Sequence, residues 1–147
     1  MYKIETYAEA SAENERILGK KLTSQSHGFS KMIQQVDDFL TEDTRWENRL
    51  VESHPEVAFQ MLNNGRGLQY SKHTEEGLQE RIAILQSCGV DPVPMFSEFA
   101  PKQQEDVVDA VCLAVSAKLG CDNGFRTIPE NPVCDNHGLK MQMVFGK

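Results

Sequence analysis

The sequence predicts a helix-rich α/β fold with a small sheet. Apolar side chains recur at spacings of three and four residues along several segments, which is typical of amphipathic helices. Capping residues and glycines stand at the ends of these segments. Only two segments have the character of strands, and two strands make a poor sheet on their own. Either the helices form the core, or strands of a larger sheet are missing from this chain.

The first part of the chain is predicted to be helical. We expect a helix over 7–18 that stops at Gly19, because glycine adopts the left-handed conformation that ends helices. A polar loop is expected over 20–28. A second, amphipathic helix is expected over 29–40, with its apolar side chains at Phe29, Met32, Ile33, Val36, Phe39 and Leu40.

The middle of the chain is predicted to hold a short strand and two helices. The strand is expected over 49–52. Ser53 then has the position of a helix cap, and Glu56, three residues later, completes a capping box. A loop rich in glycine and basic residues follows over 65–73, and Thr74 is expected to cap the next helix.

The last part is predicted to hold the most apolar helix and a second strand. Pro101 suits a first turn, and the helix is expected over 102–119 with Gly120 at its end. Apolar and polar residues alternate over 139–145, which indicates a strand. No repeat or linker divides the sequence, so we expect one domain over 1–147.

Composition narrows the function classes. The chain has 147 residues, with 15 Lys and Arg against 22 Asp and Glu, and a formal net charge of −7. This balance argues against a protein that coats nucleic acid non-specifically, since such binding needs many cations on phosphates. It does not exclude an enzyme that grips nucleic acid locally through metal ions.

Targeting signals and cysteines give a further expectation. The start has no basic region followed by an apolar stretch, and no apolar run approaches the roughly 20 residues of a membrane span. The four cysteines form no C-x-x-C pair and are sparse for a disulfide scaffold. We therefore expect a cytoplasmic, reduced protein without a membrane segment.

Asp109 is the strongest local anomaly. It is the one charged residue in the apolar run Val107–Val115, and a buried carboxylate is costly unless a cation or a donor meets it. Asp106 lies three residues earlier on the same helix face. A magnesium ion between the two carboxylates would suit this arrangement. The alternative is an acid-rich first turn that favours the helix dipole, with Asp109 paired to an arginine.

Glu52 and His54 are the second candidate pair. Glu52 ends the expected strand just before a helix, and ligands in α/β sheets bind beyond the carboxyl ends of strands. His54 lies two residues on, so both side chains could face one way, with His54 as a phosphate donor or general acid–base group. The alternatives are an exposed acid at a strand end and a histidine bonded to the local backbone.

Basic residues gather in one part of this acidic chain, namely Arg66, Lys72, His73 and Arg81. They could contact an anion or a nucleic-acid backbone, and the alternative is a solvated loop. Cys134-x-x-His137 also has the spacing of zinc ligands, with Cys121 upstream. No second paired motif accompanies it, so zinc is not favoured.

Several of these motifs, taken in order, resemble the DUF429 family, which is described as predicted nucleases of RNase H-like fold. The resemblance rests on V-E-S-H-P-E-V-A-F at 51–59, S-K-H-T at 71–74, E-R-I at 80–82, E-D-V-V-D-A at 105–110 and G-L-K-M-Q-M at 138–143. It implies an RNase H-like α/β/α domain and hydrolysis of phosphodiester bonds in nucleic acid. It further implies two Mg²⁺ or Mn²⁺ ions, with Glu52, Asp106 and Asp109 as their ligands. Lys72 and Arg81 become candidates for substrate-phosphate contacts or for structural contacts.

This family pattern opens with a β-meander that carries a further aspartate, and the motifs of this chain have no counterpart for it. The resemblance therefore implies an incomplete domain whose N-terminal meander is absent. An exposed sheet edge would invite another chain, so a homo-oligomer or a partner that covers the edge is expected. The alternative function is a non-catalytic remnant that acts as a binding or oligomeric assembly module.

Overall fold

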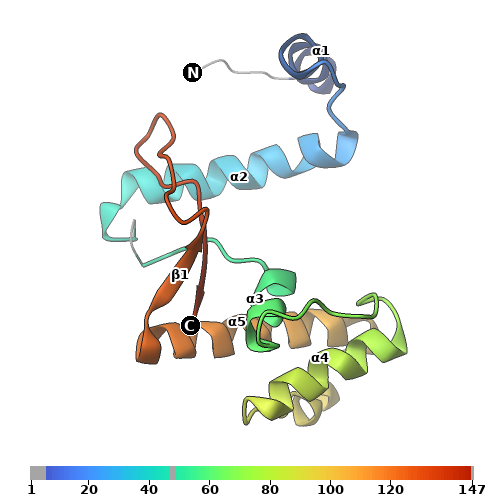
Figure 1. Cartoon of the computed structure of the whole chain (residues 1–147). Helices are drawn as coiled ribbons and strands as arrows, with labels where there is room; N and C mark the ends of the chain where they lie inside the picture. The colour runs from blue at the N-terminus through green and yellow to red at the C-terminus, as the bar shows by residue number, and fades with distance from the viewer. Residues whose placement is uncertain (1–5, 47–48, 147) are drawn as a thin grey trace. The chain divides into compact units, whose positions relative to one another are not determined.

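The computed structural model describes residues 6–46 and 49–146, and they form a helix-rich α/β structure with a small sheet, as predicted (Figure 1). Contacts divide the chain into two compact units, Met1–Leu50 and Val51–Lys147. The expectation of one domain over the whole chain stays a prediction. No helix in the described ranges combines the length and the apolar character needed to cross a bilayer.

The first unit contains helices α1 (Tyr7–Leu18) and α2 (Ser24–Glu42) and the short 3₁₀ helix η1 (Thr44–Trp46). Thr6 and Glu9 form a capping box at the start of α1. The helix ends as predicted at Gly19, whose φ of 68° lies in the left-handed region.

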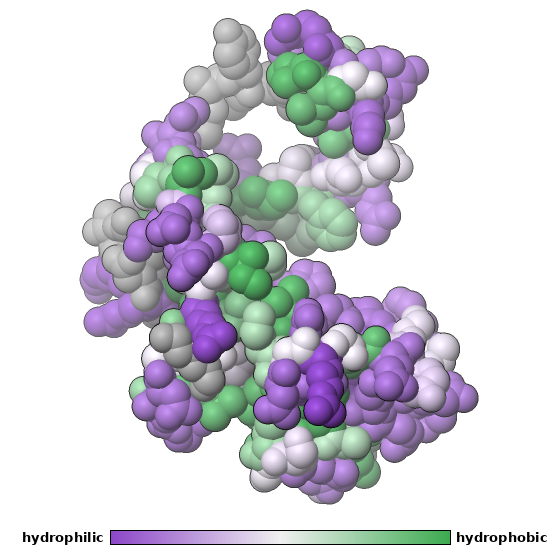
Figure 2. Space-filling view, viewed as in Figure 1, coloured by the Kyte–Doolittle hydropathy of each residue, from purple (hydrophilic) through white to green (hydrophobic). Residues whose placement is uncertain are grey.

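Helix α2 begins earlier than the sequence predicted. The polar segment 20–28 was expected to be a loop, yet Ser24 already belongs to the helix. The cause is a cap at Thr23, whose side chain accepts a hydrogen bond from the Ser26 amide at 3.0 Å. Five apolar side chains of α2 are between 46% and 67% exposed, and Leu40 is exposed less; Figure 2 shows green, hydrophobic atoms along part of this helix.

The second unit is built around three helices, α3 (Pro55–Leu62), α4 (Glu75–Ser87) and α5 (Gln104–Asn123). Both α3 and α4 pack against α5 (Figure 1). Two 3₁₀ helices, η2 (Val93–Glu98) and η3 (Pro101–Gln103), lie between α4 and α5 in the sequence. The core consists of buried side chains from the three helices and the last strand: Ala58, Phe59, Ile82, Ile84, Leu85, Val108, Cys112 and Phe145.

The ends of α4 and α5 compare differently with the prediction. Thr74 caps α4 as expected, since its hydroxyl accepts from the Gly77 amide at 3.1 Å. Helix α5, however, continues past Gly120 to Asn123. Gly120 is buried within the helix, and a Cβ atom there would lie 2.0 Å from the Phe125 ring. This glycine allows close packing and does not end the helix.

The sheet has two antiparallel strands, β1 (Phe125–Ile128) and β2 (Met143–Gly146), with Phe125 opposite Gly146. Strand β1 was not predicted. The predicted strand over 139–145 begins only at Met143, although Lys140 forms an isolated bridge with Cys134.

The predicted strand over 49–52 is wrong. Residues 49 and 50 lie in a turn and a bend, and 51–54 belong to no helix or strand. One backbone hydrogen bond, from the Val144 amide to the Glu52 carbonyl at 2.8 Å, joins this segment to β2. The short apolar run Leu50–Val51 suggested a strand, but a single backbone bond does not make a ladder.

Candidate functional site

Asp109 is half-buried and is paired with a lysine. The Nζ atom of Lys72 lies 3.3 Å from Asp109 Oδ2, and 17% of the aspartate side chain is exposed. Burial raises the pKa of the Asp109 carboxyl above its ordinary value, and Lys72 opposes this shift. The negative charge of Glu56 raises the Asp109 pKa further. The expected cation is therefore present, but it is a lysine from the segment before α4.

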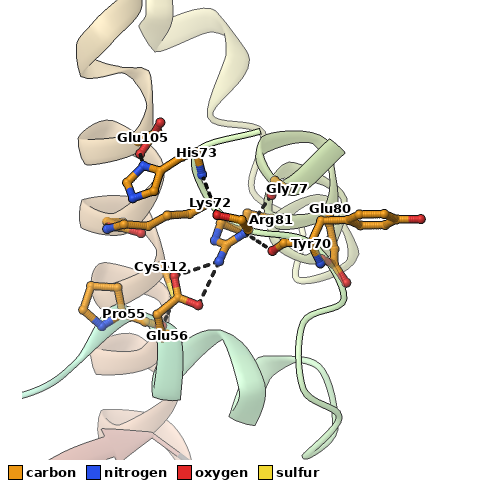
Figure 3. A network of polar contacts seen from close by, with 12 residues as sticks. Pro55, Glu56, Tyr70, Lys72, His73, Gly77, Glu80, Arg81, Glu105 and Cys112 are labelled. Carbon is orange, nitrogen blue, oxygen red and sulfur yellow. Dashed lines mark hydrogen bonds and ion pairs between the residues drawn. The ribbon is translucent and has the colours of Figure 1, made fainter. Parts of the chain in front are cut away.

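The neighbouring residue strengthens this connection. His73 Nδ1 lies 3.0 Å from Glu105 Oε2, so two consecutive residues contact two acids spaced four apart on α5 (Figure 3). Residues i and i+4 lie on the same face of a helix. The segment 71–74 is thus held against that face of α5 by two side-chain contacts.

Arg81 forms a second ionic pair, with Glu56. Its Nη2 atom donates to both carboxylate oxygens, at 2.7 and 2.8 Å, and Nη1 donates to the Gly77 carbonyl at 2.9 Å. Only 4% of the Arg81 side chain is exposed, and its guanidinium lies over the Phe59 ring. This geometry gives Arg81 a structural role between α3 and α4, one of the two roles that the resemblance implied.

The predicted capping box at the start of α3 is wrong. His54, not Ser53, is the N-cap, and its side chain makes no cap hydrogen bond. Glu56 is turned to Arg81 instead, because hydrogen bonds between a guanidinium and a carboxylate are stronger than a single bond to a backbone amide.

A shallow, open cleft of about 610 Å³ lies between the start of α3 and the loop that leads to α4. Three predicted site residues, His54, Lys72 and Arg81, line it together, and so does Tyr70. His54 is exposed and Lys72 is half-buried. The first cleft therefore contains His54 and Lys72, and Lys72 is in turn paired with Asp109.

Glu52 lies in a different place. It lines a second cleft of about 400 Å³ with Ser53, Leu113 and Ser116. Leu113 and Ser116 are four and seven residues beyond Asp109 on α5, which corresponds to about 6–10 Å along the helix axis. Arg66 is exposed and does not line the first cleft, although its neighbour Gly67 does.

The donor set allows a test of the expected metal site. Within residues 6–46 and 49–146, no three His, Cys, Asp or Glu side chains come together as a metal-binding group. Glu52, Asp106 and Asp109 are therefore not assembled as one ligand set in the described chain. Asp106, exposed one turn before Asp109, leaves a pair of carboxylates on one face of α5. Such a pair fits Mg²⁺, which takes one or two carboxylates together with water and phosphate oxygens.

The cysteines have simpler explanations. Cys134-x-x-His137 lies in a turn in which the Asp135 side chain accepts from the His137 and Leu139 amides, at 2.8 and 2.9 Å. Cys112 is fully buried, and burial raises the pKa of its thiol to about 12. A thiol with such a pKa is unreactive at neutral pH.

The sequence predicted only a capping role for Glu56, and it indicated no site role for Glu80 or Glu105. The Glu80 carboxylate accepts hydrogen bonds from the amides of Gln69 and Tyr70, at 3.0 and 3.1 Å. One signal was available for Glu56. Arg81 lies on the same face of α4 as Leu78 and Leu85, three residues before it and four after it. A guanidinium that is buried on such an apolar face requires a carboxylate partner.

Comparison with known proteins adds one finding. The model of a family described as "Protein of unknown function (DUF429)" matches residues 1–133. The match ends before the segment 138–143, which is the last of the motifs on which the resemblance rests. No curated protein and no solved structure gives a significant match to the chain.

Proposed function

As the match over residues 1–133 establishes, the chain belongs to the DUF429 family, whose function is unknown, and we propose that it is a nuclease-like phosphodiester hydrolase centred on Asp109. The observation that supports this most is the Lys72–Asp109 pair at the first cleft. It joins a half-buried carboxylate of raised pKa to a cation beside an open surface. A carboxylate with raised pKa is a better proton acceptor near neutral pH than an ordinary aspartate.

A divalent cation belongs to this proposal. Asp106 would hold Mg²⁺ or Mn²⁺ beside Asp109, with water and substrate oxygens completing the shell. When bound, the ion would supply Lewis-acid stabilisation of the phosphate. Glu52 and Asp109, the further ligands that the family resemblance implies, stay predictions.

The side chains divide the remaining work. Asp109 accepts the proton of the attacking water, which forms the new bond to phosphorus. Lys72 stabilises negative charge on the non-bridging oxygens of the phosphate. His54 lies exposed in the same cleft. It donates a proton to the leaving oxygen as the old ester bond breaks.

Cleavage of labelled oligonucleotides tests the proposal. The substrates are single-stranded and duplex DNA and RNA, each with Mg²⁺ or Mn²⁺. We expect cleavage by the wild-type chain and at least a hundredfold loss in D109N. D38N, which changes an exposed aspartate on α2, is the matched control and retains activity. Absence of cleavage by the wild-type chain, or full activity in D109N, would refute the proposal.

A second candidate function is an assembly module without catalysis. It is favoured by the described sheet, in which β1 pairs only with β2 and therefore keeps an open edge. Phe125 and Ile128 of β1 are 45% and 40% exposed. Light scattering tests this candidate, and a monomer at all concentrations would count against it.

A further inference from the structure

The loop between α3 and α4 has a fixed backbone near Arg66. Asn64 and Gly65 adopt positive φ angles of 56° and 79°, which turn the chain out of α3. Gln60 Nε2 donates to the Gly65 carbonyl and Asn63 Nδ2 to the Arg66 carbonyl, both at 3.1 Å. The Arg66 side chain is exposed and has no ion pair within the part of the chain that the structure describes.

The same loop is fixed again near Tyr70. Glu80 accepts from the Tyr70 amide at 3.1 Å, and Arg81 Nη1 donates to the Tyr70 carbonyl at 3.4 Å. The residue nevertheless remains 51% exposed, and Figure 3 shows its ring projecting away from the polar network. Tyr70 is thus an aromatic side chain on an anchored backbone at the border of the first cleft.

Charge decides what this loop can recognise. Lys72 is paired with Asp109 and Arg81 with Glu56, so neither pair adds net positive charge to the surface around the loop. The chain as a whole carries a net charge of −7. A broad electrostatic attraction to phosphates is therefore weak here. Stacking of a base on an aromatic ring does not depend on net charge, and it is the binding contribution that this loop still offers.

We propose that Tyr70 and Arg66 form a subsite for an unpaired nucleotide, in which the Tyr70 ring stacks on the base and Arg66 contacts a phosphate. This inference rests on the proposed nuclease-like function and names its substrate class as single-stranded nucleic acid. A base in a duplex has both faces covered by its neighbours, so it cannot offer one to the ring. The anchored backbone reduces the entropy lost on binding, because the loop is already ordered.

Fluorescence anisotropy of a labelled oligonucleotide of 12 nucleotides tests the subsite. The measurement is made in EDTA so that nothing is cleaved. Single-stranded DNA, single-stranded RNA and duplex DNA form separate arms. We expect both single strands to bind more tightly than the duplex. Y70A weakens single-strand binding by about 5- to 150-fold, and Y70F, which keeps the ring, stays within about twofold of the wild type. A preference for RNA over DNA would assign a contact to the 2′-hydroxyl in addition to the stack.

The arginine has its own readout. R66A lowers the slope of log affinity against log salt by about 0.7, the value for one phosphate contact on a single strand. R126A, which removes an exposed arginine on β1, is the matched control and leaves the slope unchanged. Circular dichroism of each variant establishes that the fold is retained.

The subsite would be overturned if Y70A bound single strands as tightly as the wild type, or if a duplex bound as well as a single strand. No binding of any strand would overturn it too. Failure of the proposed function gives a different pattern. Ring-dependent binding without any cleavage in Mg²⁺ or Mn²⁺ would leave the subsite standing and refute the hydrolase. Cleavage that is unaffected in Y70A would leave the hydrolase standing and refute the subsite.

Discussion

Arg81 of α4 holds both carboxylate oxygens of Glu56 of α3 through one nitrogen, Nη2, at 2.7 and 2.8 Å. The two residues are unequally exposed, since 4% of the Arg81 side chain and 38% of the Glu56 side chain reach solvent. Replacing the arginine therefore leaves a carboxylate that water reaches in part, whereas replacing the glutamate leaves a buried cation. The two substitutions should differ in cost.

Substitution at this pair should lower the free energy of unfolding. We expect a loss of about 2–3 kcal/mol for R81M, and a larger loss, about 3–5 kcal/mol, for E56A. Urea denaturation followed by circular dichroism measures both. R16A, which breaks the exposed Arg16–Glu13 pair on α1, is the control and should leave the urea midpoint unchanged. Equal losses in R81M and E56A would contradict the burial argument.

The stability of the chain should carry a pH dependence from Asp109. Its pKa in the folded state lies above the ordinary value of 3.8, so the folded state binds the proton more tightly than the unfolded state. The favourable contribution is complete below pH 3.8 and is lost as pH rises through the raised pKa. The difference in unfolding free energy between wild type and D109N should therefore turn against the wild type as pH rises. A difference that stays constant from pH 3.5 to 7 would contradict the raised pKa.

Divalent cations should raise the melting temperature through the α5 carboxylates. A ligand that binds only the folded state stabilises it, so Mg²⁺ or Mn²⁺ at a hundred times its dissociation constant adds about 2.7 kcal/mol. We expect D106N to abolish the rise without altering the metal-free melting temperature, because Asp106 is exposed. D38N is again the control. A wild-type melting temperature indifferent to both ions would refute this site.

Thiol reactivity should separate the four cysteines. Cys88, Cys121 and Cys134 are exposed, whereas Cys112 is fully buried with a pKa of about 12. A chromogenic disulfide reagent should titrate three thiols in the native chain and four in denaturant. Reaction of all four under native conditions would indicate that the α3–α5 contact opens readily.

Local sequence signals predicted the fold where a short-range interaction decides it. Thr74 caps α4 and Gly19 ends α1, and in both cases the deciding bond lies within one turn. The same reasoning failed for Glu56, because its partner Arg81 lies 25 residues away and outcompetes the local amide. Strand β1 was missed because its four residues alternate little in burial.

For the site, the sequence identified the residue that needs a partner but not the partner itself. One charge in an apolar helix predicted that Asp109 would meet a cation, and Lys72 meets it from 37 residues away. The family resemblance groups Glu52 with the helix carboxylates, and the local pattern placed Glu52 at the end of a strand that the structure does not contain. Without that strand, nothing in the local pattern fixes where its side chain lies.

The burial of Phe145 has a consequence for where the working unit ends. This side chain is 1% exposed and belongs to the core formed by α3, α4 and α5, yet it lies twelve residues beyond the end of the family match. A fragment cut at residue 133 would keep every residue that the family model matches and would lose a buried side chain of its own core. The boundary of the family description and the boundary of the folding unit are therefore different, and any expression fragment should extend at least to Gly146.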